Sequence, residues 1–316
     1  MPAIMDTMDI AFPHLGIYLR GVPKTITIGS FSIAWYGVIL AFAMLMGILM
    51  AARVARKTGQ DPNLYWDVSI WLLVFSVLGA RIYYVIFFWD AYKDNPLQIL
   101  NLRGGGLAIY GGIIGGVLTL LIYCRIRRKP FLELMDTAVY GLVLGQAIGR
   151  WGNFVNREVF GRYTDTLFAM RLPVAMVRER DIDSSIAAHM AEGTNYIQVH
   201  PTFLYESVWN LCLLLLMLFL VRKRRFRGEV SLLYFGGYGL GRGIIEYIRT
   251  DQLYITGTQI PVNMVLGFAV FALSCLLGAA AARQVRQGRR ESIDYSRVPP
   301  FGGRTGQGAG SEKSDQ

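Results

Sequence analysis

The chain has 316 residues, of which 53% are hydrophobic and only 17% are charged. Soluble domains carry about a quarter charged residues, so this composition excludes an ordinary soluble domain and favours several membrane spans. The formal net charge is +10, but most lysines and arginines flank long apolar stretches. That placement indicates membrane topology and lipid contact rather than binding to nucleic acid.

Seven apolar stretches follow one another along the chain, each near the length of about 20 residues that crosses a bilayer as a helix. The third, fourth and sixth are the weaker ones because they are short or rich in glycine. We therefore predict an all-α polytopic membrane protein with about seven transmembrane helices, at 31–52, 66–88, 106–124, 132–149, 204–221, 229–248 and 261–282.

The segments that connect these spans alternate in charge. The short segments on one side hold three basic residues, Lys93, Arg103 and Arg249. On the other side, basic clusters follow the first, third, fifth and seventh spans. Because positive residues are retained on the cytoplasmic side, we expect an extracytoplasmic N-terminus and a cytoplasmic C-terminus. The four basic clusters lie at Arg53–Lys57, Arg125–Lys129, Arg222–Arg227 and Arg283–Arg290.

The polar segments divide the chain into parts. Residues 1–30 are expected to form an extracytoplasmic N-terminal segment without the pattern of a cleaved signal peptide, followed by a transmembrane domain at 31–284. Within that domain, 150–203 is too long for a simple connection, and we expect a small extracytoplasmic head there, between the fourth and fifth spans. The polar residues 285–316 are expected to be a disordered cytoplasmic tail.

Charged side chains interrupt several spans, and they fall near the extracytoplasmic ends. Such residues are costly in a bilayer and indicate function by default. Arg150 and Arg242 carry guanidinium forks suited to phosphate, and Arg81 is a third candidate. Glu246 follows Arg242 by one helical turn and is placed to hold it.

Each candidate also has an ordinary structural explanation. A single arginine near a span end often extends to water, and Arg81 fits that explanation as well as a binding role. Tyr36 and Tyr110, at the outer ends of the first and third spans, have the positions of interfacial aromatic residues. The evidence for a site is the convergence of polar residues from six spans on one side of the membrane.

Residues 149–161 read GRWGNFVNREVFG and resemble the signature G-R-x-G-N-F-x-N-x-E-x-x-G of the prolipoprotein diacylglyceryl transferases. The sequence HPTFLYE at 200–206 matches the family pattern H-P-T-x-L-Y-E, and shorter matches surround Tyr36, Arg81, Tyr110 and Arg242. The resemblance covers about 30–282. It implies that the headgroup site is shaped by the signature residues Asn153, Asn156, Glu158 and Gly161.

The resemblance implies an enzyme of a bacterial inner membrane whose catalytic domain is 31–284. Such an enzyme moves the diacylglyceryl group of phosphatidylglycerol to the lipobox cysteine thiol of a prolipoprotein, forming a thioether and releasing glycerol phosphate. Arg150 and Arg242 would hold the phosphate and neutralise the leaving group; Tyr36 would hydrogen-bond the lipid, and Glu246 would orient Arg242. Membrane lipids are further partners, and no metal, organic cofactor or nucleic acid is implied.

Tyr110 departs from the family pattern, because some members carry a histidine there that has been proposed as the general base. A tyrosine with an ordinary pKa near 10 is a poor base at neutral pH. Either nearby arginines activate Tyr110, or it only donates a hydrogen bond. We favour formation of the thiolate in the positive field of the arginines, which lowers the pKa of a thiol.

Three other functions are compatible with parts of this pattern. A transporter or channel would place polar groups at mid-membrane and on both faces, which this chain does not do. A non-catalytic lipid-binding subunit would need the phosphate site alone. A phospholipid-using transferase with another acceptor is not distinguished by the residues, because the acceptor groove has no readable motif.

Overall fold

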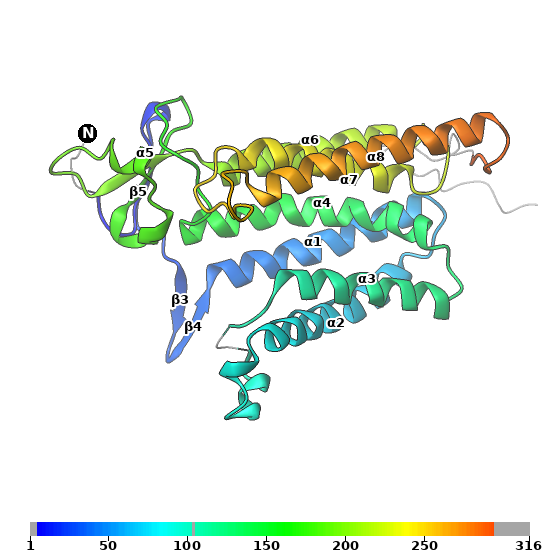
Figure 1. Cartoon of the computed structure of the whole chain (residues 1–316), viewed down its shortest axis with the longest axis horizontal. Helices are drawn as coiled ribbons and strands as arrows, with labels where there is room; N and C mark the ends of the chain where they lie inside the picture. The colour runs from blue at the N-terminus through cyan, green and yellow to red at the C-terminus, as the bar shows by residue number, and fades with distance from the viewer. Residues whose placement is uncertain (1–4, 103–104, 294–316) are drawn as a thin grey trace, which may run out of the picture.

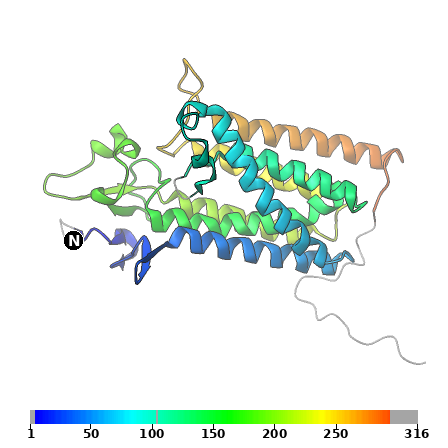
Figure 2. The same ribbon diagram turned by 90° about the horizontal axis from the view of Figure 1, so that it is seen from below.

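The computed structural model describes residues 5–102 and 105–293, and within them seven long helices lie side by side with a small head at one end (Figure 1). Six run along one direction, whereas α2 crosses them obliquely (Figure 2). The long helices are α1 Trp35–Lys57, α2 Asn63–Phe87, α3 Ile109–Ile126, α4 Phe131–Asn156, α6 Thr202–Leu220, α7 Glu229–Glu246 and α8 Val262–Arg286.

Six of these helices, all but α7, are long and apolar enough to cross a membrane. The chain is therefore a polytopic membrane protein, as its composition predicts. The helix α7 has 18 residues, like α3, but three of the 18 are charged, namely Glu229, Arg242 and Glu246. It packs between α6 and α8 in the same bundle, and a seventh crossing stays a prediction.

Glycines allow the helices to pack in close pairs, α1 with α4, α2 with α3, and α7 with α8. A Cβ on Gly47 of α1 would lie 2.7 Å from the carbonyl oxygen of Gly141 on α4. A Cβ on Gly239 of α7 would lie 2.7 Å from the carbonyl oxygen of Gly267 on α8. Small residues at these crossings let the backbones touch, which is the main source of helix association in lipid.

The prediction of an all-α protein is wrong in one respect, because the structure contains two small sheets. The first has the antiparallel order β2-β1-β5-β6, and the second is the hairpin β3-β4 beside the start of α1 (Figure 1). The strands are β1 Ile10–Phe12, β2 Ile17–Leu19, β3 Thr25–Ile28, β4 Phe31–Ala34, β5 Met170–Pro173 and β6 Tyr196–Val199. The remaining short elements are α5 Ser184–Ala187 and the 3-10 helices Pro13–Leu15, Trp89–Ala91, Pro96–Leu100, Val174–Met176 and Glu179–Asp181.

Strand pairing changes two features of the predicted organisation, namely the start of the first span and the separation of the N-terminal segment from the head. The first span was expected from residue 31, but 31–34 pair with β3, so α1 begins at Trp35. The N-terminal segment supplies three strands, β1, β2 and β3, and its Ala11 pairs with Arg171 of the head. The segment 1–30 and the head 150–203 thus share one sheet. Most of the predicted tail, 294–316, lies outside the described residues.

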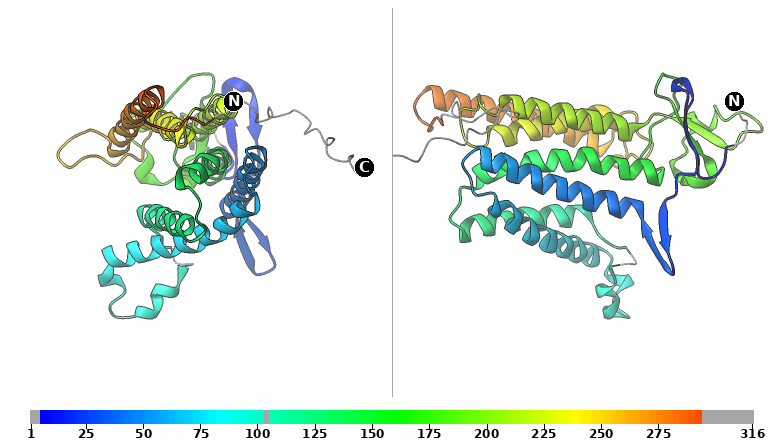
Figure 3. Two further views of the ribbon diagram at one scale, coloured as in Figure 1. Left: turned by 90° about the vertical axis from the view of Figure 1, so that its right-hand side faces the viewer. Right: turned by 180° about the vertical axis from the view of Figure 1, so that it is seen from behind.

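The outer end of α4 is anchored in the core of the head. Phe154, in its last turn, belongs to the same buried core cluster as Ile10 of β1, Leu172 of β5 and Ile197 of β6. The starts of α6 and α8 and the ends of α4 and α7 all lie at the head end of the bundle (Figure 3). This arrangement brings the polar ends of four helices together beneath the head.

Candidate active site

A single carboxylate joins the two arginines that were predicted to hold a phosphate. Glu206, in the second turn of α6, places Oε2 against Nη2 of Arg150 on α4. Its Oε1 lies 3.6 Å from Nη1 of Arg242 on α7. The Glu206 side chain is only 5% exposed, so three helices meet at a buried ion pair network.

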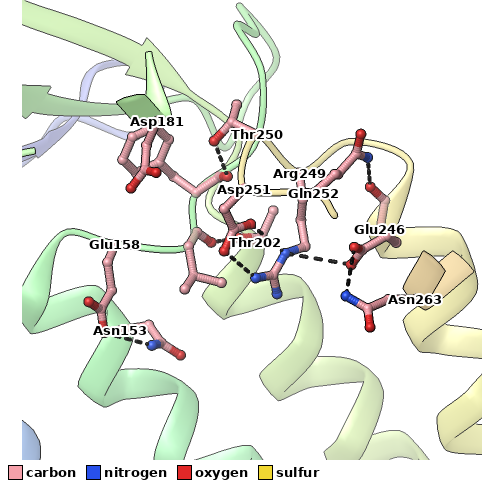
Figure 4. A network of polar contacts seen from close by, with 12 residues as sticks. Asn153, Glu158, Asp181, Thr202, Glu246, Arg249, Thr250, Asp251, Gln252 and Asn263 are labelled. Carbon is pink, nitrogen blue, oxygen red and sulfur yellow. Dashed lines mark hydrogen bonds and ion pairs between the residues drawn. The ribbon is translucent and has the colours of Figure 1, made fainter. Parts of the chain in front are cut away.

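Glu246 holds Arg242 from the same helix, as the spacing predicts. Its Oε2 lies 2.7 Å from Nη2 of Arg242, and its Oε1 accepts a hydrogen bond from Asn263 of α8 at 3.0 Å. The amide of Gln252 donates to the backbone carbonyl of Glu246 (Figure 4). Glu246 is fully buried, so its carboxylate is fixed by partners rather than by water.

Arg249 completes this group just beyond the end of α7. It donates to both carboxylate oxygens of Asp251, at 2.9 and 2.6 Å (Figure 4), and its Nη1 lies 3.2 Å from Oε1 of Glu206. Burial alone would raise the pKa of Asp251, but the hydrogen bonds and charge of Arg249 outweigh it and lower that pKa. We call the whole set the arginine–carboxylate cluster; its members are Arg150, Arg242, Arg249, Glu206, Glu246 and Asp251.

The cluster balances three guanidinium groups against three carboxylates, which is the condition for burying charges at tolerable cost. Three buried polar atoms in or beside it nevertheless have no hydrogen-bond partner among the described residues, namely Nη1 of Arg242, Oε2 of Glu246 and Oε1 of Gln146. Gln146 precedes Arg150 by one helical turn on α4. Unsatisfied buried groups are rare in folded proteins, and a catalytic role or a bound water or ion is a common reason for them.

The signature residues form a second group next to the cluster. Oε1 of Glu158 accepts hydrogen bonds from the amides of Asn153 at 3.1 Å and Asn156 at 3.3 Å, and its Oε2 accepts one from Arg178 at 3.1 Å. Arg150 reaches the same group, since its Nη1 lies 3.5 Å from Oδ1 of Asn153. Four of the predicted binding residues are thus brought together.

Tyr36 and Gly161 occupy close-packed positions around this group. The ring of Tyr36, at the start of α1, lies against Gly152, where a Cβ would come within 2.8 Å of Cδ2. Gly161 lies between the backbones of His200 and Ile248, and its N–H donates to the carbonyl of His200 at 3.0 Å. A Cβ there would lie 2.8 Å from the carbonyl oxygen of Ile248. These two predicted site residues support the site through packing.

Arg81 lies elsewhere, in the α2–α3 pair. All five N–H groups of its guanidinium donate to backbone carbonyls of the segment between α2 and α3, and its Cζ lies 5.0 Å from the centre of the Tyr92 ring. The acceptors are the carbonyls of Gln98, Ile99, Asn101, Gly105 and Gly106. Because backbone carbonyls accept from every N–H group of its guanidinium, the structure favours the structural explanation for Arg81.

Tyr110 lies in the first turn of α3, half exposed, and its hydroxyl makes no hydrogen bond within the described residues. No group of three histidine, cysteine, aspartate or glutamate side chains in 5–102 and 105–293 has the arrangement of a metal site. The sequence interpretation assigned no role to Glu206, Asn263 or Asp251. The sequence did single out Glu206, because it ends the motif HPTFLYE. For Asn263 and Asp251, no motif indicates which residues of other segments lie beside them.

The helices and the buried cluster define a polytopic membrane protein with a polar site built between the head-end termini of its helices. The model of the prolipoprotein diacylglyceryl transferase family matches residues 23–279. The chain therefore belongs to the prolipoprotein diacylglyceryl transferase family, and the transferase activity predicted from its sequence is confirmed.

Curated relatives match most of the chain. The phosphatidylglycerol–prolipoprotein diacylglyceryl transferase of Synechococcus elongatus is 41% identical over 285 residues, covering 87% of this chain and 92% of the relative. The enzyme of the same name from Listeria monocytogenes serotype 4a is 40% identical over 266 residues, covering 84% and 90%. That of Trichormus variabilis is 40% identical over 252 residues, covering 78% and 85%.

Proposed function

We propose that this enzyme takes the diacylglyceryl group from phosphatidylglycerol and joins it to the lipobox cysteine thiol of a prolipoprotein, the first step of lipoprotein maturation. The printed names of its relatives support both substrates. The observation that carries the proposal is the convergence of Arg150 and Arg242, from two different helices, on one buried anion, the carboxylate of Glu206. A phosphodiester has the charge and the paired oxygens that such a convergence accepts.

Arg150 and Arg242 bind the phosphate in this proposal. The Nη1 group of Arg242 has no hydrogen bond among the described residues, so a donor is already available for a phosphate oxygen. In the transfer, the thiol sulfur bonds to the terminal glycerol carbon of the diacylglyceryl group while the bond from that carbon to the phosphate oxygen breaks. The leaving group gains negative charge, which two preorganised guanidinium groups stabilise more than they stabilise the bound lipid.

The remaining predicted residues orient these two arginines. Glu246 fixes Arg242, and Asn153 contacts Arg150 while it also donates to Glu158. Asn156 holds Glu158 from the other side, and Tyr36 and Gly161 set the packing around the group. Each of these residues therefore acts on the position of the phosphate rather than on the reacting bond.

The fate of the thiol proton follows from the same charges. A thiolate forms more readily in a positive field, and the proton leaves to water or to the phosphate. Tyr110 is half exposed and unbonded, which supports a secondary role for it rather than general base catalysis. The reaction needs no metal or organic cofactor, since neither step requires electron transfer or a Lewis acid.

The site lies at the head end of the helices, and we propose that this end faces the outside of a bacterial inner membrane. Basic residues gather at the opposite ends of α1, α3, α6 and α8, which supports a cytoplasmic location for those ends and for the C-terminus. The N-terminus is then extracytoplasmic. Prolipoproteins and phosphatidylglycerol would reach the site from the outer leaflet, and nucleic acid is not a partner.

The proposal is tested by a transfer assay with purified protein, phosphatidylglycerol vesicles and a lipobox peptide. Wild type should convert the peptide to a thioether-lipidated product, and a peptide with serine in place of cysteine should not react. Arg150→Ala and Arg242→Ala should lose transfer, whereas Arg20→Ala, which changes an exposed arginine of the N-terminal segment, should retain it. A folded wild-type protein that transfers nothing would overturn the proposal.

A further inference from the structure

The cluster contains one carboxylate whose position differs from that of the other two. Glu246 is held by Asn263, and Asp251 is held by two hydrogen bonds from Arg249 alone. Glu206 is the one carboxylate in the described part of the chain that contacts three arginines, namely Arg150, Arg242 and Arg249. Its carboxylate therefore lies at the point where the three guanidinium groups face one another.

Glu206 is also the only carboxylate that pairs with Arg150 among the described residues. Arg242 and Arg249 each have a second acidic partner, at 2.7 Å from Glu246 and 2.6 Å from Asp251 respectively. If Glu206 moved away, two of the arginines would keep a counter-charge and Arg150 would have none. Another anion that contacts both Arg150 and Nη1 of Arg242 would best take the place of the Glu206 carboxylate.

A phosphate added to the intact cluster would place four anions against three cations. Like charges about 4 Å apart repel strongly in a protein interior, so addition without displacement is unfavourable. Exchange of one carboxylate for one phosphodiester keeps the charges matched. Among the three carboxylates, only Glu206 lies between both phosphate-binding arginines.

We propose that Glu206 is an internal counter-anion that occupies the phosphate position of the lipid-free enzyme and is displaced from Arg150 and Arg242 by the phosphate of the substrate. Glu206 is thus a positioning residue: it keeps the arginines charged, buried and aimed, and it competes with the headgroup. The same competition aids release, because the carboxylate returns to the arginines as glycerol phosphate departs. This inference rests on the proposed phosphate site.

The test removes the charge of Glu206 and measures binding of an anion. Glu206→Gln keeps the shape of the side chain, but its neutral amide cannot compete with a phosphate for the arginines. Glycerol phosphate should therefore inhibit transfer about tenfold more strongly than in wild type, within the usual range for coupled sites. The KM for phosphatidylglycerol should fall and kcat should fall with it, because product leaves more slowly. Glu206→Asp, which keeps the charge on a shorter side chain, should give values between those of wild type and Glu206→Gln.

Thermal unfolding supplies a readout that does not depend on turnover. Glu206→Gln leaves Arg150 without a counter-charge and should unfold at a lower temperature than wild type. Glycerol phosphate should recover that loss in the variant and raise the unfolding temperature of wild type much less. Glu192→Gln, which removes an exposed head carboxylate, should respond as wild type does.

The two proposals fail in distinguishable ways. Absence of transfer by wild type would reject the proposed function, whatever the variants do. Wild-type transfer together with weaker binding of glycerol phosphate by Glu206→Gln would reject the exchange, because Glu206 would then assist phosphate binding. Unchanged inhibition and no rescue by glycerol phosphate would likewise reject it. If Glu206→Gln does not fold, Glu206→Asp decides, since its shorter side chain should still give stronger inhibition than wild type.

Discussion

The amide of Asn263, in the first turn of α8, donates to Oε1 of Glu246, in the last turn of α7, at 3.0 Å. The other oxygen of Glu246 lies 2.7 Å from Arg242. A residue of the last helix therefore sets the orientation of a predicted phosphate-binding arginine through one carboxylate. This contact links α8 to the site although no side chain of α8 was assigned to it from the sequence.

Replacement of Asn263 by alanine should impair transfer without abolishing it. The change leaves a buried carboxylate oxygen without its donor, which costs about 1–3 kcal/mol, and Arg242 loses its fixed orientation. We expect kcat/KM for phosphatidylglycerol to fall roughly tenfold. Leu266→Ala, an exposed position on the same helix, is the matched control. Equal activities of the two variants would show that Glu246 needs no support from α8.

Substitution of Arg81 by lysine should lower stability rather than substrate affinity. A lysine ammonium cannot make the five backbone hydrogen bonds of the guanidinium, and the carbonyls of the α2–α3 segment lose donors. We expect a loss of about 2 kcal/mol, measured as a lower midpoint of thermal unfolding in detergent. The KM of the folded fraction should stay near wild type. A large increase in KM at unchanged stability would instead return Arg81 to the phosphate site.

The spans and the presence of Arg150 and Arg242 in one polar site were predictable because both are encoded locally. A stretch of apolar residues indicates a helix in lipid by its length alone, and Arg150 lies inside a contiguous motif. The strands were not predictable, since β1 has three residues and pairs with a segment some 160 positions away. The hydrogen bonds of Arg81 were hidden for the same reason, because backbone carbonyls carry no sequence signal.

The role of Tyr110 is decided by removal of its hydroxyl. If the thiol is deprotonated in the field of the arginines, Tyr110→Phe should keep nearly full turnover. Loss of a true general base would cost on the order of a hundredfold or more. The measurement is kcat between pH 6 and pH 9 for wild type and variant, with the lipobox peptide saturating. A hundredfold deficit that shrinks as the pH rises would assign the proton transfer to Tyr110.

Arg157 should prove to be the residue that attaches the N-terminal segment to the head. Its guanidinium is almost fully buried and donates to the carbonyls of Met8 at 2.7 Å, Val22 at 2.7 Å and Val155 at 2.9 Å. Burial lowers its pKa, but an arginine stays protonated at any ordinary pH, so these bonds persist. Arg157→Lys cannot reach the three carbonyls at once, and the strands β1 and β2 should then detach more often.

Limited proteolysis of the purified protein measures that detachment directly. Cleavage within residues 5–34 should be several times faster in Arg157→Lys than in wild type, because local opening exposes the chain. Arg162→Lys is the matched control, since Arg162 is about half exposed and its guanidinium lies 3.7 Å from Asp183. Transfer should fall less than cleavage rises, as the core of the head still holds α4 through Phe154. Equal cleavage in both variants would mean that strand pairing alone attaches the segment, and that Arg157 only fills space.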